Sequence, residues 1–109
     1  MNLDKLRAPR YLSEMKNKPN YTQQNRMLAI FKALANTNRL KILKLIYAAQ
    51  DGKISVSELV ENMDINQSTI SDHLKLMRIQ KIVRAQQQGY NMFYSINEPL
   101  VAELISRMD

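Results

Sequence analysis

Apolar residues recur along much of the chain at the spacing of an amphipathic helix. The first stretch covers residues 21–34, where the apolar positions at i, i+3, i+4 and i+7 are Met27, Ile30, Phe31 and Leu34. After a polar interruption, residues 38–50 are apolar over a wide arc, which is typical of a helix at the centre of a core. Thr37 is the expected N-cap of this second helix, and Asp51-Gly52 is expected to end it.

Two further helices are predicted in residues 55–80, on either side of a tight turn. Ser55 and Glu58 have the spacing of a capping box, so a short helix should begin here and run to about residue 63. Asn66 is expected to cap the second helix. This helix has an apolar and a polar face, formed respectively by Ile70, His73, Leu74 and Met77 and by Ser68, Ser71, Asp72 and Lys75.

A two-stranded ribbon and a last helix are predicted for the rest of the chain. Residues 82–87 and 91–96 read as strands, and Gln88-Gly89 lies at the turn, where glycine supplies a positive φ. The last helix, capped by Asn97, carries the apolar residues Leu100, Val101, Leu104, Ile105 and Met108. With a short strand at residues 54–56, this is a mostly α fold with a small β-hairpin (α+β), in the order of a winged helix-turn-helix.

Length and composition narrow the class of protein. At 109 residues the chain is long enough for one domain, predicted over residues 21–109. Residues 1–20, with Pro9 and Pro19 as breaks, are expected to be a basic arm, either as one helical turn packed on the domain or as a partly disordered tail. The formal net charge of +6 favours an acidic partner, with nucleic acid first.

Several classes of function are disfavoured by what the sequence lacks. The absence of cysteine excludes disulfides, thiolate metal sites and cysteine redox sensing. There is no secretory signal and no apolar run that could span a membrane, so a cytoplasmic protein is expected. An enzyme is not expected, because the chain has one histidine, on a predicted buried face, no glycine-rich phosphate loop and no recognisable nucleophile with a base.

Three segments of the chain match the motifs of one family in the same order. Residues 31–43 read FKALANTNRLKIL, residues 67–75 read QSTISDHLK and residues 92–96 read MFYSI. They resemble the opening signature, the recognition helix and the second wing strand of the ArsR/SmtB family of bacterial repressors. The resemblance covers residues 25–97 and implies a homodimer that binds operator DNA and represses transcription.

The residues with which family members sense metals are missing here. Thiolate-sensing relatives place two cysteines where this chain has Ser55 and Ser57, and serine hydroxyls are poor ligands for soft metals. Other relatives bind zinc between their last helices with histidines and carboxylates. The last helix here has Glu98, Glu103 and Asp109 but no histidine. We therefore expect no metal site of the family's usual kinds and no cofactor.

Two residues of the recognition helix have alternative interpretations. His73 lies in the apolar stripe, and a structural role, bonded to backbone or phosphate, is favoured over pH sensing or ligand binding. Asp72 replaces the longer polar or basic residue that is common in the family. Its carboxylate could accept a hydrogen bond from a cytosine amino group or pair with Lys75 one turn on.

The resemblance and the helix faces together predict the site residues. Base edges are assigned to Gln67, Ser68, Thr69, Ser71 and Asp72. Phosphates are assigned to Lys75, Arg78, Lys81 and Arg84, with Arg39 and Lys41 as weaker candidates. The wing tip consists of Gln86, Gln87, Gln88 and Asn91, where relatives often carry arginine. The dimer interface is assigned to Met27, Ile30, Phe31, Leu100, Val101, Leu104, Ile105 and Met108, with the core of the protomer as the alternative.

The predicted function is that of a sequence-specific regulator that binds double-stranded DNA. It is expected to be a homodimeric repressor on an inverted-repeat operator, because two recognition helices related by a two-fold axis read two half-sites. The alternative is a winged-helix module that binds a protein or RNA partner, since a fold does not by itself fix a function.

Overall fold

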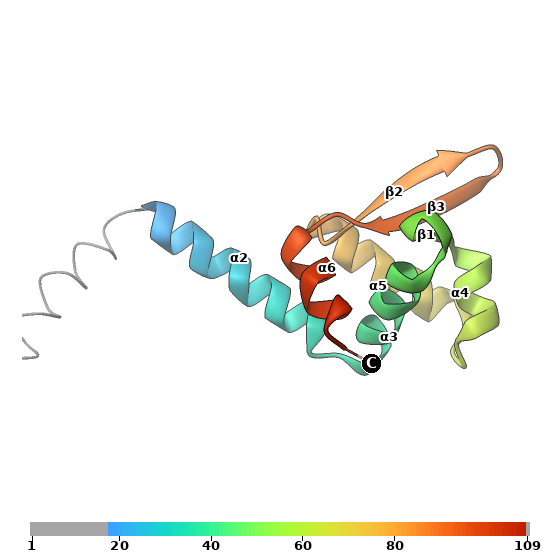
Figure 1. Ribbon diagram of the computed structural model, residues 1–109, viewed down its shortest axis with the longest axis horizontal. Coiled ribbons are helices and arrows are strands. Elements are labelled where there is room, and N and C mark those ends of the chain that lie inside the picture. Colours follow the sequence, from blue (N-terminus) through green and yellow to red (C-terminus); the bar gives the residue numbers. More distant parts are fainter. Residues whose placement is uncertain (1–17, 109) are drawn as a thin grey trace, which may run out of the picture. The chain divides into compact units, whose positions relative to one another are not determined.

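The computed structural model describes residues 18–108, and side chains from residue 22 onward. The elements are α2 (Lys18–Leu34), α3 (Thr37–Ala48), a 3₁₀ turn η1 (Gln50–Gly52), β1 (Lys53–Ser55), α4 (Val56–Asn62), α5 (Gln67–Ile79), β2 (Val83–Gln88), β3 (Asn91–Ile96) and α6 (Pro99–Ser106) (Figure 1). The predicted order of helices and hairpin is confirmed. The predictions made for residues 1–17 lie outside the described residues.

The chain divides into two compact units within α2, after Phe31. Helix α2 begins at Lys18, three residues before the predicted start, so Pro19 lies in its first turn instead of breaking the chain. Proline is tolerated there because its missing N–H would have no partner within the helix. The second unit contains every element from α3 onward.

The sheet has three antiparallel strands in the order β1-β3-β2. Strand β1 pairs only with the inner part of β3, from Phe93 to Ser95, so the outer half of the β2–β3 ribbon has no third strand (Figure 1). Gln88 pairs with Asn91, and the turn is therefore Gly89-Tyr90, one residue later than predicted. Gly89 has a φ of +63°, as the first loop position of a type II′ turn requires.

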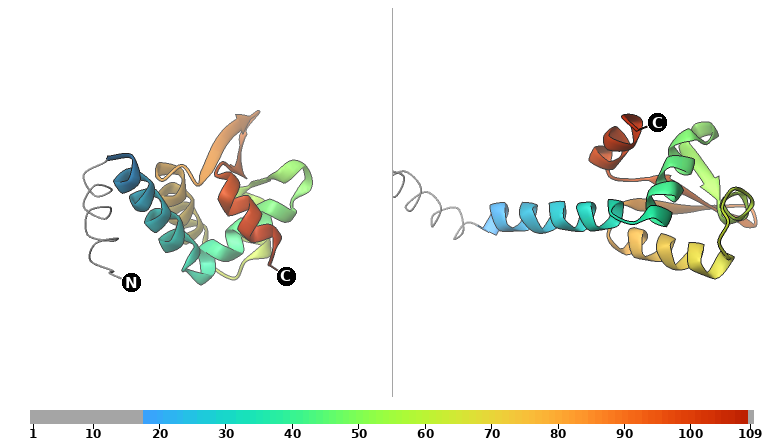
Figure 2. Two further views of the ribbon diagram at one scale, coloured as in Figure 1. Left: turned by 60° about the vertical axis from the view of Figure 1, so that its left-hand side comes forward. Right: turned by 90° about the horizontal axis from the view of Figure 1, so that it is seen from below.

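Helix α3 is the centre of the core, as its wide apolar arc predicted. Ile42, Leu43 and Ile46 are fully buried, and α3 contacts α5, α6, β1 and β3. The base of the ribbon passes between α5 and α6 (Figure 2, right). The other fully buried large side chains of this unit come from α4, α5, the loop after α5, β2 and α6. They are Leu59, Ile70, Leu74, Met77, Ile82, Val83 and Val101.

Two predicted helix caps are wrong by one residue. Asn36, not Thr37, caps α3, because its Oδ1 accepts a hydrogen bond from the N–H of Arg39 at 3.0 Å. At α6 the cap is Glu98, which accepts from the N–H of Leu100 at 3.4 Å. Asn97 instead donates its Nδ2 to the carbonyl of Lys81 at 3.0 Å, which ties the start of α6 to the loop before β2.

The apolar stripes assigned to a dimer interface are split by burial. Val101 and Ile105 of α6 are 0% and 3% exposed within one chain, and Ile30 of α2 is 1% exposed. Within one chain these three side chains keep almost no accessible surface, which favours the alternative interpretation as core residues, and their role in a dimer stays a prediction. Helix α6 ends at Ser106, so Met108 lies beyond it, with 43% of its surface exposed.

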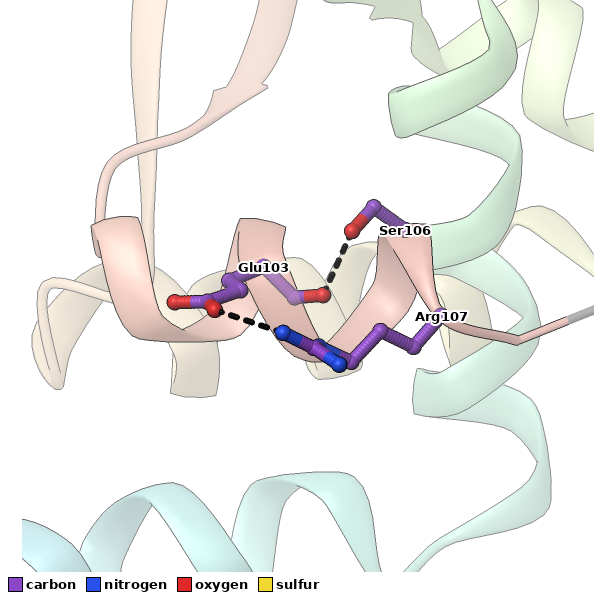
Figure 3. A network of polar contacts seen from close by, with 3 residues as sticks. All are labelled: Glu103, Ser106 and Arg107. Carbon is purple, nitrogen blue, oxygen red and sulfur yellow. Dashed lines mark hydrogen bonds and ion pairs between the residues drawn. The ribbon is translucent and has the colours of Figure 1, made fainter.

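The rest of the predicted stripe keeps some accessible surface. Phe31 is 52% exposed, while Met27, Leu100 and Leu104 are half-buried. A polar side of α6 is marked by Glu103, whose carboxylate pairs with Arg107 at 3.1 Å and whose carbonyl accepts from the hydroxyl of Ser106 (Figure 3).

Candidate nucleic-acid interface

Local capping explains how α4 and α5 begin. The capping box at α4 is confirmed, since Ser55 Oγ accepts from the N–H of Glu58 at 3.2 Å and Glu58 Oε1 accepts from the N–H of Ser55 at 3.1 Å. At α5, Asn66 Oδ1 accepts from the N–H of Thr69 at 2.8 Å and from the hydroxyl of Ser68 at 2.9 Å. The first turn of α5 is thus fixed by a single side chain that precedes it.

The two faces of α5 separate as predicted. Ile70, Leu74 and Met77 are at most 1% exposed and hold the helix against the core. The opposite side is exposed from the first residue to the last turn and carries Gln67, Ser68, Ser71, Asp72, Lys75 and Arg78. The structure therefore brings together all the base-edge candidates except Thr69, which is half-buried, and places two phosphate candidates next to them.

The chemistry of this exposed side changes along the helix. Its N-terminal half offers amide, hydroxyl and carboxylate groups on short side chains, and its C-terminal half offers Lys75 and Arg78. Within residues 18–108 no ion pair joins Asp72 to Lys75, so of the two alternatives for Asp72 the pairing with Lys75 is not observed. The Asp72 carboxylate instead acts on its neighbour, where it raises the pKa of His73 against two larger opposing effects.

The remaining cationic candidates lie between α5 and the ribbon. Lys81 is exposed in the connecting loop, with a φ of +59°, a left-handed conformation that is uncommon for lysine. Arg84 is exposed on β2, and its Nε donates to the hydroxyl of Ser95 on β3 at 3.1 Å. This bond joins the arginine to the residue that faces it in the β2–β3 strand pair.

The wing tip is polar and aromatic. The predicted residues Gln86, Gln87, Gln88 and Asn91 are all exposed. Lys53 of β1 donates to Gln88 Oε1 at 3.2 Å, and its ammonium lies 5.6 Å from the centre of the Phe93 ring, which holds Gln88 along the ribbon. Tyr90 is fully exposed at the turn. The sequence reading missed Tyr90, although its place after a turn glycine was the available signal.

Arg39 is half-buried and its guanidinium forms bonds within the protein, while its role as a weaker phosphate candidate stays a prediction. Its Nε and Nη2 donate to the carbonyls of Ala33 and Lys32, at 3.1 and 3.0 Å, in the last turn of α2. Its Nη1 lies 3.5 Å from His73 Nδ1. The expected partner of His73, backbone or phosphate, is thus replaced within the protein by a guanidinium. Burial and the Arg39 charge lower the pKa of His73, and Asp72 opposes them.

Ser55 and Ser57, at the family's thiolate positions, take part in hydrogen bonds within the protein. Ser55 Oγ lies 3.1 Å from Ser57 Oγ and donates to Glu58 Oε1 at 3.0 Å. In the described part of the chain no three His, Asp or Glu side chains gather closely enough to hold a metal ion. No helix in that part combines the length and apolar character that crossing a bilayer requires.

Comparison with known proteins identifies the family. The family described as "Bacterial regulatory protein, arsR family" matches residues 36–85. An uncharacterized HTH-type transcriptional regulator of Methanocaldococcus jannaschii is 38% identical over 73% of this chain and 88% of its own length. The transcriptional activator HlyU of Vibrio cholerae is 30% identical over 90% of this chain and 83% of its own. The transcriptional repressor PagR of Bacillus anthracis is 32% identical over 73% and 78%, respectively.

Solved structures agree with this assignment. The crystal structure of PagR superposes with a TM-score of 0.74 at 29% identity, over 82% of this chain and 99% of PagR. A solution structure of a homodimeric winged helix-turn-helix domain from Mycobacterium bovis superposes with a TM-score of 0.72 at 27% identity, over 83% and 81% of the two chains. The chain belongs to the ArsR family of bacterial regulatory proteins and is a winged helix-turn-helix transcriptional regulator.

Proposed function

We propose that this regulator is a cytoplasmic homodimeric repressor that inserts α5 into the major groove of an inverted-repeat operator. The observation that carries the proposal is the exposed side of α5, which changes from short polar side chains to cations away from the capped N-terminus. Helix-turn-helix proteins read bases with the N-terminal part of the second helix, so the polar half would face base edges.

Each part of α5 would have a different task on DNA. Gln67 can form a bidentate pair with adenine, Ser71 can bond to several bases, and Asp72 can accept from the amino group of cytosine. Lys75 and Arg78 would hold phosphates on the rim of the groove, joined by Lys81 and Arg84 nearer the ribbon. Phosphate contacts of this kind give affinity and salt dependence without sequence preference.

The wing would add contacts beside the major groove. Gln86 and Asn91 offer hydrogen bonds in place of the arginine common in relatives, and Tyr90 offers a ring and a hydroxyl at full exposure. The ring can pack on a sugar edge while the hydroxyl bonds to a phosphate oxygen. The wing should therefore support affinity more than it selects a sequence.

Dimerisation would use the apolar surface that the protomer leaves uncovered. Phe31 on α2 and Met108 after α6 are exposed, and Met27, Leu100 and Leu104 keep part of their surface. The Mycobacterium bovis neighbour is described as homodimeric. A two-fold axis would set the half-sites about 10 base pairs or slightly more apart. A dimer of this kind covers its operator and blocks other proteins from it, which is the basis of repression.

The test is fluorescence anisotropy with the protein's own upstream DNA and a scrambled duplex, at two salt concentrations. A preference of about a thousandfold or more for one duplex would support specific binding. Equal, weak and salt-sensitive binding to both would direct attention to other operators or to a protein or RNA partner. In vitro transcription from the bound promoter then separates repression from activation, because one relative is named an activator and another a repressor.

A further inference from the structure

Arg39 lies in α3, and its guanidinium contacts both the last turn of α2 and His73 of α5. Its own backbone N–H is held by the N-cap Asn36 at the first turn of α3. Its Nε and Nη2 bond to carbonyls in the last turn of α2, groups that have no partner within that helix. A cation at this end is also favoured by the helix dipole. Arg39 therefore fixes the turn between α2 and α3 before it reaches α5.

The third contact of Arg39 is with the recognition helix. Nη1 lies 3.5 Å from Nδ1 of His73, which sits halfway along α5 between the buried stripe and the exposed polar side. A guanidinium can only donate, so Nδ1 must be the acceptor and the ring proton must be on Nε2. The contact thus requires a neutral imidazole, and a second proton would place two cations against each other.

We propose that Arg39 and His73 form a positioning pair that sets how α5 is held for DNA binding, and that protonation of His73 breaks the pair and weakens operator binding. The proposal rests on the proposed function, in which α5 carries the base contacts. Neither residue needs to touch DNA for this effect. A small rotation of α5 is enough, because base contacts depend on the register of short side chains in the groove.

The surroundings of His73 favour the neutral form. Burial contributes most, and the Arg39 charge on α3 adds to it. Asp72 on α5 itself opposes both and is outweighed, so the pKa of His73 lies below its usual value. Helix α4 and strand β2 also pack on α5, but the charges that act on His73 are those of Arg39 and Asp72. The pair is therefore intact near neutral pH and is lost on acidification.

The experiment measures operator affinity between about pH 8 and pH 5.5 for the wild-type protein and His73→Gln. The wild-type affinity should fall by up to about tenfold, the factor that one unit of pKa difference between free and bound protein produces. Glutamine can accept the same N–H from Arg39 and does not titrate, so His73→Gln should bind normally at the higher pH and lose the His73-dependent fall. The dimer mass is checked at each pH.

A matched pair of variants separates position from charge. Arg39→Gln and Lys32→Gln each remove one positive charge near the turn between α2 and α3, but the Lys32 side chain is exposed and does not contact His73. Arg39→Gln should weaken operator binding several-fold more than Lys32→Gln. It should also raise the pKa of His73 measured by NMR, which is unambiguous because the chain has one histidine. Arg39→Lys keeps the charge but cannot serve all three acceptors, so it should not restore binding.

Three results would overturn the positioning pair. They are identical pH profiles for wild type and His73→Gln, affinity that rises on acidification as it would if protonated His73 met a phosphate, and equal losses for Arg39→Gln and Lys32→Gln. Failure of the proposed function looks different: the wild-type protein would then show no preference for any operator at any pH.

Discussion

Substitutions of Asn66, which caps the recognition helix α5, can distinguish effects on protein stability from effects on DNA binding. Asn66 Oδ1 accepts from the N–H of Thr69 at 2.8 Å and from the hydroxyl of Ser68 at 2.9 Å. Asn66→Ala leaves both donors without that partner at the end of α5 that faces the proposed groove. Losing an N-cap costs about 1 kcal/mol, which corresponds to a fall of about 4–8 °C in Tm for a domain of this size.

Asn66→Ala should also weaken operator binding, by no more than the free energy that the lost cap contributes. If the first turn must re-form when DNA binds, the full 1 kcal/mol is lost from binding, or about fivefold in Kd. Two variants keep the cap and differ in charge. Asn66→Ser and Asn66→Asp should both keep the Tm close to wild type, because serine and aspartate cap as well as asparagine. Only Asn66→Asp brings a carboxylate towards the phosphates, so its affinity should drop and its salt dependence should become weaker.

The assays are thermal unfolding followed by circular dichroism and anisotropy with operator DNA for all four proteins. An unchanged Tm for Asn66→Ala would refute the energetic role of the cap. Equal operator affinity for Asn66→Ser and Asn66→Asp would refute the placement of this end of α5 at DNA, whatever happens to stability.

Three further predictions test other parts of the molecule. Lys75→Ala should weaken binding to operator and scrambled DNA alike and reduce the salt slope by about one, whereas Ser71→Ala should reduce only the preference for operator. Equal losses for the two variants on both duplexes, measured by anisotropy, would contradict the assignment of Lys75 to phosphates and Ser71 to bases. The pKa of His73 is lowered in the folded state, so the unfolded chain binds a proton at a higher pH than the folded protein does. The free energy of unfolding of the wild type, measured in urea titrations, should therefore decline below about pH 6.5, and it should decline less for His73→Gln. Ile105→Ala should cost about 2–5 kcal/mol of stability, while Met108→Ala should leave protomer stability within about 0.5 kcal/mol and weaken the dimer in sedimentation.

Local motifs were predictable where two or three neighbouring residues decide the outcome. The capping box at Ser55 and the cap at Asn66 are such cases, because each needs only its own helix turn. Asn97 is the counterexample. Its side chain is drawn to the carbonyl of Lys81, far along the sequence, and Glu98 caps α6 instead. Competition from a tertiary contact cannot be read from spacing.

Periodicity identified apolar faces but not what covers them. The stripe on α6 was predicted correctly as a face, yet Val101 and Ile105 are covered by the protomer's own core. The same limit applies to Arg39. Its charge suggested phosphate binding, but the carbonyls in the last turn of α2 and the imidazole of His73 meet at one point only after α3 and α5 have packed. These three acceptors are supplied by the fold, so the residue type of Arg39 alone could not reveal them.

The contacts that hold α5 differ in their response to acid. The apolar side chains Ile70, Leu74 and Met77 do not titrate, and the cap Asn66 is neutral at every pH. Among the contacts between α5 and the rest of the described protein, the bond of His73 to Arg39 is the one that depends on a neutral imidazole. Acid should therefore loosen the helix in its middle while its core and its first turn remain. Operator affinity should begin to fall at a higher pH than the pH at which tertiary structure is lost, and a coincident change of both in one titration would mean that His73 acts only through global stability.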